Sequence, residues 1–552
     1  MEYTPQNLEY AVSVFYNGEQ SERAKAHSWL TTAQRAPEAW NFVWELLQPN
    51  KATELQFYAA TTLHTKILRC WMEVPPESYN ELRDKLLQAV FLYAKGPKIV
   101  TNRLCISLAA FILQQGSVDL VSILRPLSNV ENSSLLLEVL TVIPEEYNSM
   151  TMGTVLRTKN RASLNQACPA VLEDMLRYLQ SAYNDYSTGP PSEETVQCWV
   201  VAATCVRSWL TLGGDDAPDH CVSLADRMPL VRALHAVPKV LYTWNEAISD
   251  SALDACEAAL SAIRAAATTG DASRYHTSAL QVFQCMAELA TPIMARDNVP
   301  NSINEELVSS IITCVVAIVE THAHTLVEND SDPSVRQMID LLIAGQAAPG
   351  HYPLHETRSS MLLGGVWCTL QDELQTAIRS HKSVNLDLWR DVFSQLLSAL
   401  VFKSEAPSDS SMSSEDVELL RCYRQDIADN VLYCYCVLGA SCWTTIEAAY
   451  VAAETDIRRE AVLHIFLALA DIASDLMDVP YHGVVPLLQH SIQAITASAH
   501  SRLVATGLEC LGAYAECVKY LPAPPGRGVA SLCSEAARAA LSAHPAPAAR
   551  AL

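Results

Sequence analysis

Histidine pairs are the residues of this chain whose types and spacing could bind a metal ion. His351 and His355 are four positions apart, a spacing that places two side chains on one face of a helix. Pro353 lies between them and prevents a regular helix there. His322 and His324 are two positions apart and would not converge, whereas zinc needs about four converging ligands. We therefore predict no metal site, and a metal-dependent enzyme built on His351 and His355 is the third-ranked alternative.

The sequence contains no motif for nucleophilic or phosphate chemistry. The glycine motifs that bind phosphates or dinucleotides are absent, and so are the zinc-protease and serine-hydrolase motifs. The 17 cysteines include no C-x-x-C pair, and the closest two, Cys434 and Cys436, would face apart on a helix. Such scattered cysteines are typical of reduced, buried thiols. We expect the acidic pair Glu145-Glu146, which follows Pro144, to be solvated at a helix edge. The prediction is a protein that is not an enzyme and uses no cofactor.

Four basic residues near the N-terminus could instead bind an acidic protein surface. Lys66, Arg69, Lys98 and Arg103 lie on or beside the second helices of consecutive predicted helix pairs. In a right-handed array of such pairs the second helices line the concave side, so these cations would form a row there. Alternatively, the side chains lie over the helix ends and keep only their charges in water. From the residues alone, the second interpretation is favoured.

The stretch from Trp29 to Trp71 contains the helices that would position the first of these cations. Two apolar segments are separated by a short polar turn. The second, predicted as a helix over 52–71, has an apolar stripe at four-residue intervals, formed by Leu55, Ala59, Leu63, Ile67 and Trp71. Phe57, Tyr58 and Leu68 lie off this stripe, so the helix must be covered on more than one side. This pattern favours a helix stacked inside a long array over one in a small bundle.

Composition and turn signals extend this pattern along the chain. The 552 residues are 50 % hydrophobic and include only 18 glycines, which favours helices over a β-rich fold. A single compact core rarely exceeds about 250–300 residues, so several domains or one elongated array is expected. Proline and glycine breaks divide the chain into roughly 12 helix pairs of about 45 residues, the size of a HEAT repeat. The predicted fold class is all-α, a HEAT-repeat (armadillo-like) right-handed superhelical solenoid of antiparallel helix pairs.

The helices can be placed individually from the same signals. The first hundred-odd residues are predicted to hold helices at 7–16, 21–34, 39–47, 52–71, 79–94 and 98–114. Further helices are predicted around 117–125, 133–142, 163–183, 193–212, 245–267, 272–296, 303–327, 334–346, 358–379, 385–402, 414–439, 456–477, 483–497, 499–519 and 527–542. The acidic segment Lys403 to Glu418 is predicted as a solvated loop between two helices.

Net charge restricts the classes of partner. The chain has 38 basic and 61 acidic residues, a formal charge of −23, which repels phosphate backbones. This charge either favours basic proteins as partners or only keeps a large protein in solution. We expect no direct nucleic-acid partner. The most apolar run, Ile311 to Val319, is far short of the ~18 residues that span a bilayer, so no membrane partner is expected. The N-terminus lacks a basic segment followed by an apolar one, so no signal peptide is expected.

The stretch from Trp29 to Trp71 also resembles a known family. The matching residues are Trp29-Leu30, Ala39-Trp40, Trp44, Leu46-Leu47, Gln56-Phe57-Tyr58-Ala59-Ala60, Leu63 and Lys66-Ile67. This pattern is similar to the N-terminal domain of the importin-beta family of nuclear transport receptors. One branch of that family is also matched by Lys98-Ile99-Val100, Arg103-Leu104-Cys105, Leu140 to Glu146, Gly350 to Pro353 with Glu356-Thr357, Trp367 with Leu370 to Asp372, and Tyr423-Arg424 with Asp426-Ile427.

The resemblance implies a function without catalysis. Receptors of this family are HEAT superhelices that bind the GTPase Ran in its GTP form on the concave face of the N-terminal repeats. The implied Ran-binding residues are Lys66, Arg69, Lys98 and Arg103. Protein cargo binds in the absence of Ran and is released when Ran-GTP binds, and some cargo is exported with Ran-GTP. Weak contacts with Phe-Gly nucleoporins would use grooves between outer helices, while the receptor shuttles between cytoplasm and nucleus.

The resemblance also implies an organisation into domains. We expect an importin-beta N-terminal domain at 26–92, HEAT repeats at 93–230 and 231–520, and an Ala/Pro-rich truncated repeat at 521–552. Family members have roughly twenty helix pairs, more than the roughly 12 predicted here. Within the N-terminal domain, Trp29, Trp40, Trp44, Gln56, Leu63 and Ile67 are expected to hold the helices together. Its polar edge, with Lys66 and Arg69, is the candidate for recognition. The competing interpretation is a static HEAT-repeat scaffold that assembles a cytosolic protein complex.

Overall fold

The computed structural model describes residues 2–116, 120–127, 133–185, 189–214, 220–244, 249–295, 302–407, 412–475 and 481–518, with a few isolated positions beyond. Regular structure in these ranges consists of α-helices and short 3-10 turns, without a strand. The first helices are α1 (Pro5–Asn17), α2 (Gln20–Ala33), α3 (Ala39–Leu46), α4 (Thr53–Arg69), α5 (Tyr79–Leu92), α6 (Lys98–Gln115), α7 (Leu120–Leu124), α8 (Ser133–Ser149), α9 (Thr154–Asp185), α10 (Glu193–Leu210), α11 (Leu224–Trp244) and α12 (Asp250–Thr268). They are followed by α13 (His276–Ala295), α14 (Ser302–Thr321), α15 (Ala323–Glu328), α16 (Pro333–Gln346), α17 (Arg358–Leu362), α18 (Val366–Arg379), α19 (Leu386–Lys403), α20 (Ser414–Leu438), α21 (Ser441–Val451), α22 (Asp456–Ala468), α23 (Ala470–Asp475), α24 (Tyr481–Ala497), α25 (Ser501–Ala513) and α26 (Ala515–Val518).

The chain divides into two compact units. Unit 1 comprises Met1–Ser278 with Asn301–Leu307, and unit 2 comprises Ala279–Pro300 with Val308–Leu552. The predicted domain boundaries at 92, 230 and 520 stay predictions, and the segment predicted at 521–552 lies almost entirely outside the described residues. Within the described ranges, no helix combines the length and the apolarity needed to cross a lipid bilayer.

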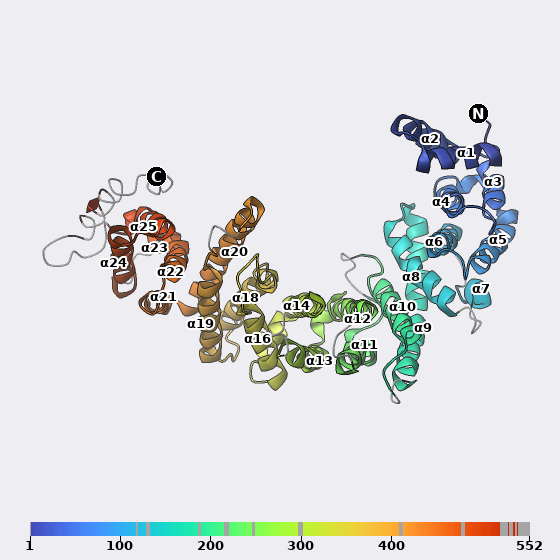
Figure 1. Ribbon diagram of the computed structural model, residues 1–552. Coiled ribbons are helices and arrows are strands. Elements are labelled where there is room, and N and C mark those ends of the chain that lie inside the picture. The colour runs from blue at the N-terminus through green and yellow to red at the C-terminus, as the bar shows by residue number, and fades with distance from the viewer. Residues whose placement is uncertain are drawn as a thin grey trace. The chain divides into compact units, whose positions relative to one another are not determined.

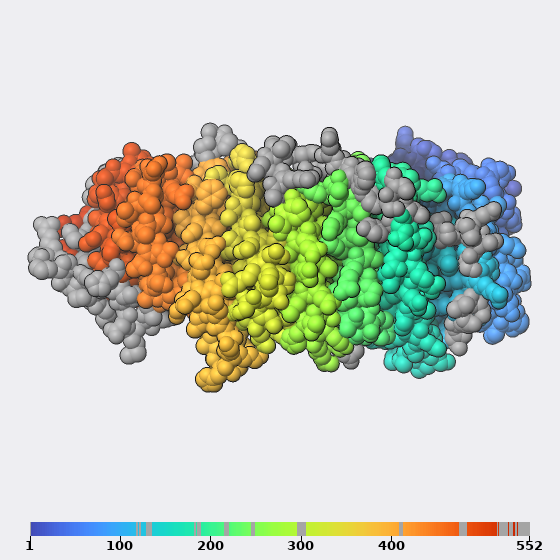
Figure 2. Space-filling view, turned by 90° about the horizontal axis from the view of Figure 1, so that it is seen from below, coloured from blue at the N-terminus to red at the C-terminus, as the bar shows by residue number. Residues whose placement is uncertain are grey.

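Helix pairs stack in order within each unit. In unit 1, α3 packs on α4 and α5 on α6, and the second helices form a continuous row from α4 through α6, α8 and α10 to α12. Figure 1 shows this row on the concave side of unit 1, with α3, α5 and α9 on the convex side. Figure 2 shows the same pairs as successive bands from blue to green. In unit 2, a similar row runs from α16 through α19 and α22 to α25.

In several stacked pairs, side chains of a later helix donate hydrogen bonds to an earlier one at a similar spacing. Ser107 Oγ donates to the carbonyl oxygen of Ala60 at 3.4 Å, and Gln114 Nε2 donates to that of Ile67 at 3.3 Å. Both contacts join residues 47 apart. In unit 2 the Tyr514 hydroxyl donates to the carbonyl oxygen of Phe466, 48 residues earlier. This spacing agrees with the HEAT repeat of about 45 residues predicted from the breaks.

Capping side chains explain where several helices begin. Thr4 Oγ1 accepts from the backbone N–H of Asn7 at the start of α1, where Pro5 needs no hydrogen-bond partner for its nitrogen. Ser413 and Asp416 form a capping box at the start of α20. The end of the predicted acidic loop is therefore the first turn of a helix, while residues 408–411 of that loop lie outside the described residues.

The helix predictions were wrong mainly where proline occurs inside a helix. α11, which contains Pro229 and Pro238, was not predicted, and α9 starts nine residues before the predicted 163 and runs through Pro169. α8 likewise continues past Pro144 to Ser149. α21 was missed as well, next to Gly439. Packing of apolar neighbours in these helices outweighs the hydrogen bond that each proline removes.

The tryptophans of the N-terminal domain do not form its core. Leu63 and Ile67 are fully buried as expected, and Gln56 is buried with its side-chain amide donating to the carbonyl oxygens of Gln48 and Lys51. In contrast, Trp29, Trp40 and Trp44 are half-buried. The first pairs are instead held together by smaller side chains and by Tyr58, whose hydroxyl donates to the carbonyl oxygen of Leu30 at 2.9 Å.

Candidate functional site

The N-terminal inner surface consists of the accessible residues of the second helices in unit 1. These residues recur at three- and four-residue intervals, which place them on one face of each helix. They are Phe57, Thr61 and His64 on α4, Asn102, Arg103 and Ile106 on α6, Glu138, Thr141 and Glu145 on α8, and Thr204 and Arg207 on α10. The surface therefore mixes aromatic, neutral polar and charged groups of both signs.

Lys66 is buried, so the expectation that it lies on an exposed polar edge is wrong. Its ammonium donates to Glu73 Oε2 at 2.5 Å and to the carbonyl oxygen of Ala36 at 3.2 Å. It also lies 5.2 Å from the centre of the Trp40 ring. The Lys66 side chain is fully buried, whereas the Glu73 side chain is 40 % exposed. The contacts show a structural ion pair that closes the end of α4 against the α2–α3 turn.

The other three predicted cations are accessible but lie at two ends of the surface. Arg103 is half-exposed, with its guanidinium 5.7 Å from the centre of the Phe57 ring. Lys98 is exposed in the first turn of α6. Arg69 is exposed in the last turn of α4, whereas Lys98 lies in the first turn of the neighbouring α6. Because a helix rises 1.5 Å per residue, Arg69 lies roughly 25 Å from Lys98 along the helix axes. The structure thus brings Lys98 and Arg103 to one end and separates Arg69 from them.

Glu145 and Glu146 have different environments, so the expectation of a solvated pair is wrong for Glu146. The buried Glu146 contacts His64 of α4, with 2.9 Å between Oε1 and Nε2. Both α4 and α8 pack on α6, so the contact between His64 and Glu146 bridges two helices across α6. Residues 107–113 of α6 are all buried. Glu145 is exposed and lies 3.6 Å from the guanidinium of Arg207 on α10.

Charge on this surface is largely balanced within it. Burial raises the pKa of Glu138, and the charge of Lys98 opposes that rise. Burial likewise raises the pKa of Glu145, against the opposing charge of Arg207. Arg207 belongs to the surface but was not predicted, because none of the matching motifs includes it. Arg103 has an aromatic neighbour, and among the described residues it forms no ion pair with a carboxylate, which makes it the best candidate for recognition.

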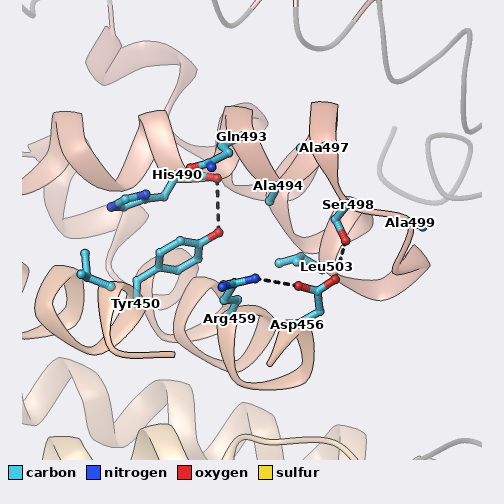
Figure 3. A pocket seen from close by; sticks show the side chains of 11 residues that line it. Tyr450, Asp456, Arg459, His490, Gln493, Ala494, Ala497, Ser498, Ala499 and Leu503 are labelled. Atoms are coloured by element: carbon cyan, nitrogen blue, oxygen red, sulfur yellow. Dashed lines mark hydrogen bonds and ion pairs between the residues drawn. The ribbon is translucent and has the colours of Figure 1, made fainter. Parts of the chain in front are cut away.

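Unit 2 contains a separate pocket of about 380 Å³ between α21, α22 and α24 (Figure 3). The rings of Tyr450 and His490 stack with centres 4.4 Å apart. Asp456 accepts from Arg459 at 3.0 Å and from the Ser498 hydroxyl at 2.8 Å. Burial lowers the pKa of His490, against the opposing charge of Glu447. These pairings occupy the charged groups of the pocket walls.

Comparisons with known proteins find two matching family models and several similar relatives. The importin-beta N-terminal domain matches residues 26–91, and the importin 13 repeat matches residues 406–441. Importin-13 of Bos taurus and importin-13 of Homo sapiens are each 30 % identical to this chain over 543 residues. The chain is thus similar to importin-13 along most of its own length. The matched region covers 94 % of this chain and 52 % of each relative, so the chain spans about half the length of the curated relatives it matches.

A solved structure of importin-13 has the same fold. It is described as the cytosolic state, and it superposes with a TM-score of 0.70 at 23 % identity, covering 90 % of this chain and 56 % of its own. More distantly, transportin MOS14 of Arabidopsis thaliana is 22 % identical over 543 residues, covering 93 % of this chain and 52 % of its own. The predicted HEAT-type solenoid and the predicted resemblance to the importin-beta family are both confirmed.

The importin-13 motifs of unit 2 form a buried polar network. Glu356 and Lys403 are both buried and lie 2.8 Å apart. Lys403 also donates to the carbonyl oxygens of Ala348 and Gly350, and Glu356 accepts from the backbone N–H and the hydroxyl of Ser359, each at 2.6 Å. The Ser359 hydroxyl forms a hydrogen bond with the Tyr423 hydroxyl. The Tyr352 ring stacks on the Tyr423 ring, with 4.5 Å between the ring centres. The motif around His351 is therefore structural, and His351 packs on Phe402.

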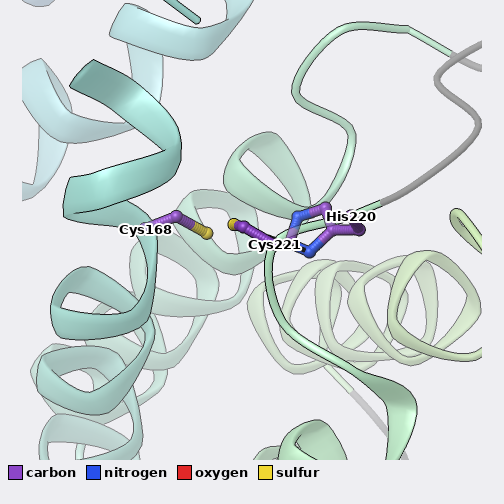
Figure 4. Close-up of side chains that lie close together, drawn as sticks. All are labelled: Cys168, His220 and Cys221. Carbon is purple, nitrogen blue, oxygen red and sulfur yellow. Dashed lines mark hydrogen bonds between the residues drawn. The ribbon is translucent and has the colours of Figure 1, made fainter. Parts of the chain in front are cut away.

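A cysteine and histidine cluster was missed by the sequence analysis. Cys168, His220 and Cys221 bring two thiols and an imidazole together (Figure 4). Among the described residues, it is the one group of three or more histidine, cysteine or carboxylate side chains whose ligand atoms lie close enough together to bind a metal ion. No motif joins residues more than fifty positions apart, and the adjacent pair His220-Cys221 was the one available signal.

Proposed function

We propose that this chain is a nuclear transport receptor that binds Ran-GTP and protein cargo. The observation that carries the proposal is the 30 % identity to importin-13 across 94 % of the chain, including the importin-beta N-terminal domain. Because the chain spans about half of those relatives, the proposal concerns the activities of N-terminal repeats. The proposed receptor shuttles between cytoplasm and nucleus, and it carries proteins into the nucleus and some proteins out.

The proposed Ran site is the N-terminal inner surface around the start of α6. Arg103 and Lys98 supply positive charge there, and the half-exposed Phe57 ring beneath the Arg103 guanidinium supplies a flat apolar contact. Arginine with an aromatic neighbour is a frequent source of binding energy at protein interfaces. Arg69, at the far end of α4, is proposed as a separate peripheral contact. Lys66 is left out because its charge is already paired.

Charge reversal at Arg103 tests this site. Arg103→Glu is expected to weaken binding of Ran-GTP by about tenfold or more, because it removes a cation and places a carboxylate on Phe57. The measurement is a titration of the full chain with Ran loaded with GTP or with GDP. Arg421→Glu, an exposed arginine of unit 2, is the matched control and should bind like the wild type. Unchanged affinity of Arg103→Glu would remove Arg103 from the site, and equal binding of Ran-GTP and Ran-GDP would refute the receptor function.

Cargo and pore contacts follow from the same proposal. The net charge of −23 supports basic, folded proteins as cargo. Release would result from linkage, since Ran-GTP and cargo prefer different curvatures of the solenoid. Phe-Gly nucleoporins are proposed to bind grooves between outer helices. A static scaffold that assembles a cytosolic complex is the alternative, and it would bind its partners whatever nucleotide Ran carries.

A further inference from the structure

Two thiols and one imidazole converge in unit 1 from separate segments. Cys168 lies in α9, directly before Pro169, whereas His220 and Cys221 lie in the segment that precedes α11. One ligand atom from each residue lies within 4.8 Å of the others. Figure 4 shows the Cys168 and Cys221 sulfurs directed toward one another, with the His220 ring beside Cys221.

We propose that Cys168, His220 and Cys221 form a binding site for zinc. Thiolate and imidazole are the ligands that zinc takes in proteins, at about 2.3 Å for sulfur and 2.0–2.1 Å for nitrogen. Tetrahedral geometry with these bond lengths separates the ligand atoms by roughly 3.5–3.8 Å. The separation of 4.0 Å between Cys221 Sγ and His220 Nδ1 is close to that range, so binding requires only small movements of the side chains.

Burial gives the site a closed side and an open side. Cys168 is fully buried in α9, which holds its sulfur in one place. Cys221 is exposed and His220 is partly exposed, so an ion can enter from the solvent. Three protein ligands leave the fourth position of a tetrahedral zinc ion to water. The site thus has the composition of two cysteines, one histidine and one solvent ligand.

The surroundings orient the histidine. His220 Nε2 lies 3.2 Å from the carbonyl oxygen of Trp209, a fully buried residue whose indole N–H donates to the Leu140 carbonyl oxygen at 2.9 Å. A proton held on Nε2 by a backbone carbonyl leaves the lone pair on Nδ1, the arrangement that metal-binding histidines use. In the ion-free structure Nδ1 accepts from the Val222 backbone N–H at 3.1 Å. Zinc would replace that donor.

A buried arginine anchors the segment that carries His220 and Cys221. The Arg227 side chain donates from Nε to the Val222 carbonyl oxygen at 2.9 Å. Its Nη1 donates to the carbonyl oxygens of Ala266 at 2.8 Å and Thr269 at 3.1 Å, at the end of α12. Two of the three ligands are therefore held near their binding positions before zinc arrives, which lowers the entropic cost of binding.

The test is zinc uptake by the reduced, chelator-treated full chain. We expect one zinc ion per chain after gel filtration, measured by mass spectrometry, and a cobalt-substituted form with sulfur-to-cobalt charge-transfer absorption. Cys221→Ser at the exposed position and Cys168→Ser at the buried one should each weaken zinc binding by roughly 100-fold or more. Cys422→Ser removes an exposed thiol of unit 2 and is the matched control, which should bind zinc like the wild type.

Three outcomes would overturn the proposal. One is uptake well below one zinc ion per chain by the reduced wild type. Another is zinc binding that Cys221→Ser leaves unchanged, because this exposed position tests the site without threatening the fold. The last is a Cys168–Cys221 disulfide that persists in the presence of a reductant and blocks zinc, which would make the cluster a redox pair instead. Ran binding does not enter any of these measurements, so their result is independent of the proposed function.

Discussion

Lys66 illustrates how a single charged residue can be structural at the edge of a recognition surface. Its ammonium is held by Glu73 and by the Ala36 carbonyl oxygen, and the Trp40 ring covers it. Because Glu73 remains 40 % exposed, water can solvate its carboxylate after the lysine is removed. The cost of losing Lys66 therefore comes mainly from the unpaired carbonyl and the space that the side chain fills.

Lys66→Ala is expected to destabilise the N-terminal helices by about 2 kcal/mol. The measurement is hydrogen exchange of the α3 and α4 amides, since thermal unfolding of a repeat array is not a single transition. Lys95→Ala, at an exposed lysine, is the control and should change these amides little. Exchange rates in Lys66→Ala that equal those of the wild type would show that the buried pair contributes nothing.

The same pair predicts a pH dependence. The hydrogen bond from Lys66 is the main cause that lowers the pKa of Glu73 below its usual 4.5, with Trp40 adding a second hydrogen bond. A carboxyl with a lowered pKa stabilises the fold above its ordinary value and loses this contribution as the pH falls through its folded value. Protection of the α3 and α4 amides should thus fall below pH 4.5, and Glu73→Gln should show a smaller fall. An equal fall in Glu73→Gln would assign the acid sensitivity to other carboxyls.

At the scale of single residues, the sequence predicted which apolar residues are buried. It did not predict which charged residue is buried. The four-residue periodicity of α4 correctly placed Leu63 and Ile67 in the core. Lys66 follows the same helical face as Leu63, and its burial depends on Glu73 and on the Ala36 carbonyl oxygen, 30 residues earlier. Partners so far apart in sequence leave no periodic signal. The same reason explains why the cluster of Cys168 with His220 was missed.

Elements in unit 2 depend on a polar network rather than on apolar packing alone. Glu356 accepts the backbone N–H of Ser359 in the first turn of α17 and pairs with Lys403 at the end of α19. Through Ser359 the network reaches Tyr423 on α20. Three helices thus meet at one buried carboxylate, and removing its charge leaves a buried ammonium without an anion.

Glu356→Gln is therefore expected to destabilise unit 2 by about 3 kcal/mol. The measurement is hydrogen exchange of α17, α19 and α20. The double variant Glu356→Gln with Lys403→Met should recover part of the loss, because it removes the unpaired charge. Glu418→Gln, which breaks the exposed pair with Arg421, is the control and should cost little. A double variant as unstable as the sum of both single changes would show that the two residues act separately.

Helix predictions were accurate where turns are marked and wrong where proline lies within a helix. The first six predicted helices agree with α1 to α6 within about two residues at most ends, since Pro, Gly and Asn-Gly signals separate them. Pro229 and Pro238 gave the same signal inside α11, where neighbouring helices hold the chain helical. A local breaker cannot be distinguished from a tolerated one without knowing what packs around it.

For the whole molecule, the fold class and the repeat length were predictable because they are collective properties. Composition favours helices over β-rich folds, and breaks at nearly regular intervals give a period even when single boundaries are wrong. The contacts that join residues 46 to 48 apart, such as Thr506 to Glu460 and Tyr514 to Phe466, show the same period physically. The candidate recognition site was predictable only in part, because its cations belong to different ends of parallel helices.

Several hydrogen bonds between helices one repeat apart run in the same direction. In each of Ser107 to Ala60, Gln114 to Ile67 and Cys510 to Leu463, the donor side chain belongs to the later helix and the acceptor is a backbone carbonyl of the earlier one. A helical carbonyl keeps its own bond and still has a second lone pair. At these contacts the earlier helix already has its own backbone hydrogen bonds, and it offers a preformed acceptor to the next pair. A chain emerging from the ribosome can add its repeats one at a time, in the order in which they are translated.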